Sequence, residues 1–388
     1  MTALTRRQFT GGLCSCAGLA LAGCVTDGTP VGPVAPGYRP EQTTDEAGLW
    51  QAMDRVEADV KRSRFLVRDA DLNAYMHEIA CRLGTAHCSD IRVYVIRSPY
   101  FNATMAPNGM MQVYTGLLLR ARNEAQIAAV IGHELGHYLN RHSLQGLRNR
   151  RSVSDFTTFL SLGLGAAGSI VQLAAVASLF AYNRDQEREA DDVGVDLMAR
   201  AGYAPIEASK VWEQLIAERS ADDREGRERS LFFATHPAEE ERAETLRSKA
   251  GTLKTIGSEL HSDRYRQRLR AIRTILFQDE LRLREYARTL KLFEMLDAES
   301  PADAELSFFT GEVHRLRNEQ GDASKALLAY EQALAAGDAP PETFRGIGTI
   351  RMRMGDRAAA DAAFERYLTL KPHADDAAII RSYMQGQT

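Results

Sequence analysis

The sequence predicts a mainly α-helical protein of the α+β class, in which a helical domain with a small β-sheet precedes a solenoid of helical repeats. Three patterns support this prediction. Apolar residues recur every three or four positions over residues 46–83 and 123–141. Two short candidate strands lie between those segments, and the first is rich in β-branched and aromatic residues. After residue 253, small and aromatic residues recur 34 positions apart.

The size of the chain allows two folded domains. It has 388 residues, of which 44% are hydrophobic, enough for a core in each domain. We expect an export signal at 1–23, a tether rich in proline and glycine at 24–45, a first domain at 46–253 and helical repeats at 254–388. The formal net charge of -4 provides no basic excess, so nucleic acid is not an expected partner.

Residues 1–23 have the pattern of an export signal. Paired arginines precede Phe9 and an uncharged run that is too short to span a bilayer, which resembles a twin-arginine signal. The run ends in Leu-Ala-Gly-Cys24, which resembles a bacterial lipobox with Cys24 as the acylated first residue of the mature chain. The alternative is an ordinary cleaved signal. Val25 follows the cysteine, and in such lipoproteins the absence of aspartate there points to the outer membrane, facing the periplasm.

The body of the chain begins with a helical pattern from about Glu46 to Leu83. Strands are expected at 91–96 and at 110–114, the second after a Pro-Asn-Gly turn. A long helix is expected from Asn123 to Arg141, and a strongly polar helix from Asn183 to Ala201. These elements account for the predicted mixture of helices and a small sheet.

Two cysteines, Cys81 and Cys88, lie outside the N-terminal segment. In an oxidising compartment they are expected to form one disulfide that closes a small loop after a helix end. A metal site that includes the nearby His87 is the alternative, although the C-x-x-C spacing of common zinc sites is absent.

Residues 156–182 contain no charged side chain and are numerous enough to cross a membrane. Glycines and Gln172 interrupt the run, which favours a buried pair of helices or a lid. The alternative is a membrane-spanning helix, which would make the chain an integral membrane protein.

The clearest chemical signal is His133-Glu-Leu-Gly-His137 within a predicted helix. Four residues advance a helix by about 400°, so both imidazoles project from one face and can bind one metal ion. Glu134 is placed to take a proton from an attacking water. Catalytic zinc keeps three protein ligands, and we assign the third to Glu187 in the acidic run 187–191.

Asp191 lies four residues after Glu187 and so on the same helical face. Its carboxylate could accept a hydrogen bond from the second nitrogen of a liganding imidazole and so orient that ring. Glu189 points about 200° away from Glu187 and is expected to be solvated.

From about Asp71 to Leu246 the sequence resembles the gluzincin metallopeptidases of the HtpX, BepA and CAAX-protease type. The resemblance is carried by His133-Glu-Leu-Gly-His137, by Asn183-Arg184-Asp-Gln-Glu187-Arg-Glu-Ala190-Asp191, and by Thr235-His236-Pro237 with Arg242. It implies a zincin-like fold, one Zn2+ per chain, Glu187 as the third ligand, and proteolysis. Asn183 departs from the serine that the family often carries there, but neither residue is a ligand.

The resemblance assigns two further features near the active site. It places the loop of His236 close to the metal, where His236 would stabilise the oxyanion or act as a reversible fourth ligand. The segment Tyr100–Gly109 resembles the family's edge strand, which would bind an extended substrate by backbone hydrogen bonds. The alternative for that segment is an ordinary hairpin.

The C-terminal repeat resembles the tetratricopeptide repeat. Gly321, Asp322, Ala326 and Tyr330 recur as Gly355, Asp356, Ala360 and Phe364. Gly311 is three residues out of register with Gly348, which implies an insertion near residues 315–318.

Together these features predict a zinc-dependent metalloendopeptidase that hydrolyses unfolded or misassembled envelope proteins. The repeats would bind envelope assembly proteins, as in BepA-like periplasmic proteins, and a lipid anchor would hold the chain at the membrane. The alternative is a latent protease that acts mainly as a repeat-mediated chaperone or assembly factor.

Overall fold

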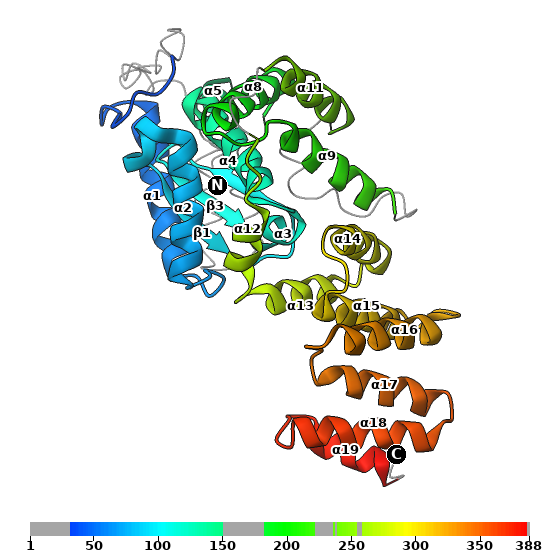
Figure 1. The fold of residues 1–388 in the computed structure, drawn as a ribbon. Coiled ribbons are helices and arrows are strands. Elements are labelled where there is room, and N and C mark those ends of the chain that lie inside the picture. The colour runs from blue at the N-terminus through cyan, green and yellow to red at the C-terminus, as the bar shows by residue number, and fades with distance from the viewer. Residues whose placement is uncertain (1–31, 150–181, 222–235, 237–238, 254–257, 386–388) are drawn as a thin grey trace, which may run out of the picture. The chain divides into compact units, whose positions relative to one another are not determined.

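The computed structural model describes residues 32–149, 182–221, 236, 239–253 and 258–385. Residues from Gly32 onward belong to one compact unit. Its first part contains α1 (Asp45–Arg62), α2 (Ala70–Gly84), the 3-10 helix η1 (Thr85–Asp90), β1 (Arg92–Ile96), β2 (Ala103–Met105), β3 (Met110–Tyr114), α3 (Thr115–Arg120), α4 (Glu124–Leu139), α5 (His142–Asn149), α8 (Arg184–Arg200), α9 (Ile206–Arg219) and α11 (Glu239–Thr252) (Figure 1).

Helices alone follow in the described C-terminal part. They are α12 (Ser262–Leu269), α13 (Arg273–Leu283), α14 (Tyr286–Glu299), α15 (Ala304–Arg317), α16 (Asp322–Ala336), α17 (Glu342–Arg353), α18 (Arg357–Leu370) and α19 (Ala377–Met384). The predicted fold class, mainly helical with a small sheet and a helical C-terminal region, is confirmed.

The sheet has three strands in the order β1-β3-β2. Central strand β3 pairs in parallel with β1 and antiparallel with β2, so β2 lies at an edge. The tight turn between β2 and β3 depends on Gly109, whose φ is +89° and whose Cβ, if present, would lie 2.0 Å from the Asp90 carbonyl oxygen. The predicted strands at 91–96 and 110–114 correspond to β1 and β3.

The helical pattern predicted from Glu46 to Leu83 is in fact two helices. Between α1 and α2 the chain is extended, and the Val67 N–H donates to the Val95 carbonyl of β1. Asp69 then caps α2 by accepting from the Leu72 N–H. The break between the two helices has a tertiary cause, because a backbone hydrogen bond to the sheet replaces helical hydrogen bonds in residues 63–69.

Helices α4 and α8 cross unusually closely. A Cβ on Gly194 of α8 would lie 2.9 Å from the His133 backbone nitrogen, and one on Gly136 of α4 would lie 2.7 Å from Ala190. Asn123 and Asn183 cap the two helices, and Asn183 forms a reciprocal capping box with Gln186. Asparagine is as good a cap as serine, which accounts for the departure at position 183.

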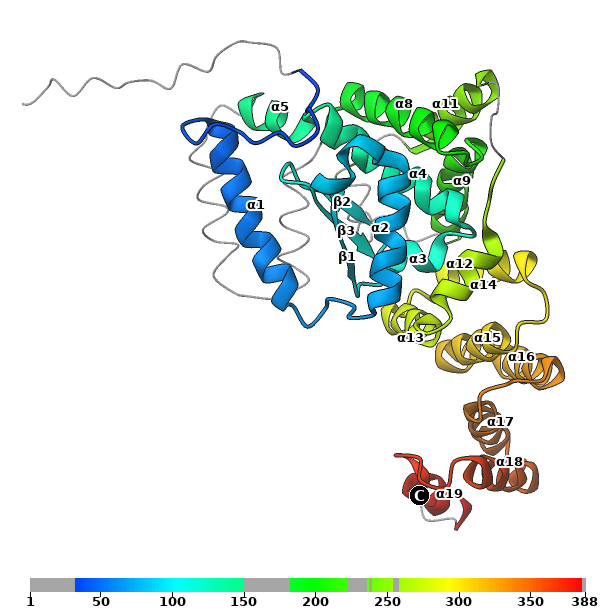
Figure 2. The same ribbon diagram turned by 60° about the vertical axis from the view of Figure 1, so that its left-hand side comes forward.

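The C-terminal helices pack as hairpins, α15 with α16 and α17 with α18 (Figures 1 and 2). Small residues allow the close contact: a Cβ on Gly311 would lie 2.5 Å from the Tyr330 ring, and one on Gly348 would lie 2.5 Å from the Phe364 ring. The arrangement is solenoid-like, as predicted. The tetratricopeptide assignment and the boundary at 253/254 stay predictions.

Several predictions concern residues outside the described ranges. The export signal, Cys24 and nearly all of the uncharged run 156–182 lie there. Within the described residues, no helix combines the length and the apolar character that crossing a membrane requires.

Candidate metal centre

The crossing of α4 and α8 brings together side chains that lie far apart in the sequence. His133 and His137 come from successive turns of α4, Glu187 from the first turn of α8, and His236 from the segment before α11. All four are buried, and one potential ligand atom from each lies within 4.8 Å of the others. The structure thus places the three predicted ligands and His236 at one point.

The atoms at this point are suited to a positive ion. The Nε2 atoms of His133 and His137 are 3.0 Å apart, and they lie 3.6 and 3.4 Å from the two Glu187 oxygens. Burial lowers the pKa of both imidazoles, which favours neutral rings with a lone pair available. Glu187 Oε2 is buried and makes no hydrogen bond of good geometry, although Arg242 Nη1 lies 2.8 Å away as an ion-pair partner. Two imidazole nitrogens and a carboxylate therefore fit the donor set of a bound metal.

Electrostatics keep Glu187 charged. Burial would raise its pKa, but His236, His137 and Arg242 outweigh burial and hold the pKa well below its usual range. A carboxylate that stays ionised is a ready ligand.

Asp191 lies where the helical spacing predicts. Its Oδ1 is 2.9 Å from Nδ1 of His133, so the other ring nitrogen of His133 faces the cluster. Arg242 in turn holds Asp191 with two hydrogen bonds, from Nε at 2.8 Å and Nη2 at 2.6 Å. The guanidinium stacks on Trp212 at 3.8 Å from the ring centre. Sequence reasoning assigned no role to Arg242 or Trp212, because their contacts depend on α11 packing against both α8 and α9.

His137 has an outer partner that the sequence analysis missed. His142 Nδ1 lies 2.8 Å from Nδ1 of His137, and His142 Nε2 lies 3.1 Å from Glu189. The Tyr182 ring stacks on His137 with centroids 3.6 Å apart. Glu189 is largely solvent-exposed, as predicted, yet it also orients His142. A histidine five residues after His137 was the available signal.

Glu134 is buried between the cluster and the sheet edge. Its Oε1 makes no hydrogen bond and lies 3.6 Å from His236 Nε2, while the Met105 backbone N–H of β2 interacts with the carboxylate. Burial raises the pKa of Glu134 to about 7, although His236 opposes the shift. A carboxyl group with that pKa, within reach of the cluster, is suited to proton transfer near neutral pH.

His236 lies inside the cluster rather than beside it. Its side chain is 3% exposed, and Nδ1 lies 2.8 Å from Glu187 Oε1 and 3.2 Å from His133 Nε2. Its neighbours in the Thr-His-Pro motif lie outside the described residues.

Known proteins share this part of the chain. A family model described as "Peptidase family M48" matches residues 67–250. The mitochondrial metalloendopeptidase OMA1 of Schizosaccharomyces pombe is 32% identical over 164 residues, covering 41% of this chain and 47% of that protein. The putative beta-barrel assembly-enhancing protease of Vibrio cholerae is 26% identical over 228 residues (55% and 46%), and its Escherichia coli K12 counterpart 23% over 237 (57% and 48%).

The chain spans about half the length of these relatives. The matched segment contains α2 to α8 and the residues of the buried cluster. Residues 67–250 are therefore similar to peptidase family M48, a family of metalloproteases.

Proposed function

We propose that the protein is a zinc-dependent metalloendopeptidase in which His133, His137 and Glu187 hold one Zn2+. The convergence of these three side chains carries the proposal. Ligand atoms 2.0–2.1 Å from a tetrahedral zinc lie about 3.3–3.4 Å apart, and the separations here are 3.0, 3.4 and 3.6 Å. A bound zinc ion would supply Lewis-acid activation of water and of the scissile carbonyl.

Glu134 would accept a proton from the attacking water and then deliver it to the leaving amine. Its position between the cluster and β2 supports this role, since a peptide laid along β2 would bring its carbonyl near Glu134. Asp191 and Arg242 would hold His133, and His142 would hold His137, so that both rings keep their orientation through turnover.

The substrates we propose are unfolded or misassembled envelope proteins. An edge strand recognises extended backbone with little sequence preference, which suits chains that have lost their fold. Two of the relatives are named beta-barrel assembly-enhancing proteases, and this supports a role in periplasmic quality control. The C-terminal helices would bind assembly proteins as tetratricopeptide repeats do. Acylated Cys24 would anchor the chain to the outer membrane.

The position of His236 favours a second candidate function. A histidine whose ring lies 2.8 Å from Glu187 and 3.2 Å from His133 can occupy the ligand position that water needs. The resting protein would then be a latent protease that acts mainly as a chaperone or assembly factor through its repeats. The competing role for His236 is stabilisation of the oxyanion during catalysis.

Complementation in the source organism tests the quality-control role. A strain lacking this protein is supplied with the wild-type chain or with Glu134→Gln, and the steady-state level of misassembled outer-membrane proteins is measured. Clearance by wild type alone supports proteolytic quality control. Full rescue by Glu134→Gln would instead establish the chaperone function and refute the need for proteolysis.

Purified protein distinguishes the two roles of His236. Zinc-loaded wild type and His236→Ala are compared for cleavage of reduced, carboxymethylated casein. Faster cleavage by the variant identifies His236 as a closing ligand. A fall in kcat with little change in KM identifies it as an oxyanion donor, because the interaction is then made only in the transition state.

A further inference from the structure

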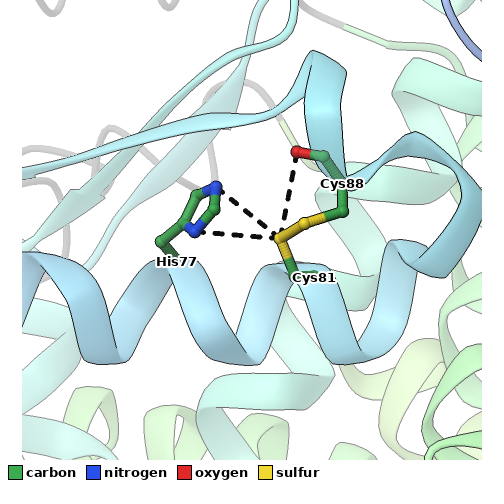
Figure 3. Close-up of a disulfide and its surroundings, with 3 residues drawn as sticks. All are labelled: His77, Cys81 and Cys88. Carbon is green, nitrogen blue, oxygen red and sulfur yellow. Dashed lines mark hydrogen bonds between the residues drawn. A yellow bond between two sulfur atoms is a disulfide. The ribbon is translucent and has the colours of Figure 1, made fainter.

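A second group of potential metal ligands surrounds the disulfide, away from the cluster on α4. Cys81 and Cys88 are joined with an S–S distance of 1.96 Å, and His77 lies beside them (Figure 3). His77 Nε2 and Nδ1 are 3.6 and 3.8 Å from Cys81 Sγ. One potential ligand atom from each of the three residues lies within 4.8 Å of the others.

Local structure explains why the three side chains meet. His77 and Cys81 are four residues apart on α2, so they share one face of that helix. Cys88 comes from η1, which folds back over the end of α2. All three residues are partly exposed, so a solvent ion can reach them.

The disulfide alone does not explain why the His77 side chain lies next to Cys81. Among the residues that the structure describes, His77 makes polar contacts only with Cys81. A disulfide sulfur is at best a weak acceptor, whereas a thiolate and an imidazole are both strong ligands for zinc. The placement of His77 is therefore better suited to the reduced cysteines than to the oxidised pair.

The distances fit a zinc site with little movement of His77. With zinc–sulfur and zinc–nitrogen bonds of about 2.3 and 2.0–2.1 Å, a tetrahedral site separates sulfur from nitrogen by about 3.6 Å. The observed separations of 3.6 and 3.8 Å already match this value. After reduction, side-chain rotation would have to separate the two sulfurs to about 3.8 Å. It would also have to bring Cys88 Sγ, now within 4.8 Å of a His77 nitrogen, to about 3.6 Å from it.

We propose that reduction of the Cys81–Cys88 disulfide creates a second metal site, formed by His77, Cys81 and Cys88, that binds Zn2+. A dithiol reductant supplies two electrons and two protons, the S–S bond breaks, and the reductant becomes a disulfide. The two thiols then lose their protons as Zn2+ binds. Zinc thereby replaces the covalent link between α2 and η1, and water completes the coordination.

Cobalt absorption tests this site independently of the cluster at His133. The full-length chain, with Cys14, Cys16 and Cys24 replaced by serine, is stripped of metal, reduced or left oxidised, and titrated with Co2+ under nitrogen. Thiolate-to-cobalt charge-transfer absorption in the near ultraviolet reports only sites with cysteine ligands, and the proposed catalytic cluster has none. Zn2+ is then added to displace the cobalt.

The reduced chain is expected to bind one more equivalent of Co2+ than the oxidised chain, with charge-transfer absorption that Zn2+ abolishes. His77→Ala should weaken Zn2+ binding at this site at least about 10-fold, the lower bound seen when even an outer partner of a ligand is lost. His87→Ala is the matched control, because His87 adjoins Cys88 but faces Asp90 at 3.8 Å. No additional cobalt in the reduced chain, or equal affinity in wild type and His77→Ala, would overturn the proposal.

Discussion

Replacement of Arg120 by methionine should strongly destabilise the junction between the peptidase domain and the C-terminal helices. Arg120 of α3 binds Glu218 of α9 at 2.6 Å and Glu280 of α13 at 3.1 Å. These side chains are only 5%, 2% and 0% exposed, so the variant leaves two buried carboxylates with Arg288, 3.4 Å from Glu218, as the nearest remaining cation. Removing one partner from a buried ion cluster costs about 3–5 kcal/mol.

Urea unfolding measures this loss. Trp212 lies on α9, the helix that carries Glu218, and in a Trp50→Phe background its fluorescence reports unfolding there. Adding Glu280→Gln to Arg120→Met removes one of the unpaired carboxylates. The double variant should therefore regain about 1–3 kcal/mol of unfolding free energy, which measures the coupling between the two residues. The control Arg266→Met breaks an exposed pair with Asp263 and should change stability by less than about 1 kcal/mol. A loss for Arg120→Met as small as that of the control would refute the reasoning.

Three further predictions concern the α4–α8 crossing, acid stability and the partner of His137. Gly194→Ala should destabilise the fold by about 1–3 kcal/mol, because its Cβ would lie 2.9 Å from a backbone atom of α4. The control Gly146→Ala on α5 has open space around its Cβ and should be neutral or stabilising, so equal urea midpoints for the two variants would contradict the prediction. Burial alone would raise the pKa of Glu57, but hydrogen bonds from Arg92, Tyr94 and Lys61 lower it to about 2. The ionised Glu57 therefore stabilises the fold above about pH 4.5, and this stabilisation is lost as the pH falls toward 2. Lowering the pH should thus reduce the free energy of unfolding of wild type more than that of Glu57→Gln. Parallel curves of unfolding free energy against pH would contradict this prediction. His142→Ala should weaken zinc binding about 10–100-fold in a chelator competition, with a smaller effect for Glu189→Ala; unchanged affinity would show that His142 does not support the site.

The sequence predicted the elements that carry the cluster because their signals are local. Two histidines four residues apart define one face of α4, and the spacing from Glu187 to Asp191 does the same for α8. A Pro-Asn-Gly turn marks the hairpin of β2 and β3. These patterns need no knowledge of what packs against them.

The missed features depend on contacts between distant segments. Apolar spacing continues on both sides of residues 63–69, and only the backbone bond of Val67 to β1 shows that the helix must stop there. Arg242 reaches Asp191 and stacks on Trp212 because α11 packs against both α8 and α9. Their roles appear only when the helices are assembled.

The charged junction at Arg120 was missed for the same reason. Glu218 and Glu280 lie 98 and 160 positions after Arg120, and each residue alone resembles an ordinary solvated charge on a helix. Burial distinguishes them, and burial is a property of the assembled helices.

Metal content measured together with peptide cleavage tests the central claim most directly. Purified wild type and Glu134→Gln are analysed for zinc and, at equal zinc loading, for cleavage of unfolded casein over time. We predict one tightly bound zinc per chain in both proteins at the His133 cluster, with cleavage only by wild type, because Glu134 serves proton transfer rather than metal binding. Absence of bound zinc, or wild-type rates of cleavage by zinc-loaded Glu134→Gln, would contradict the account.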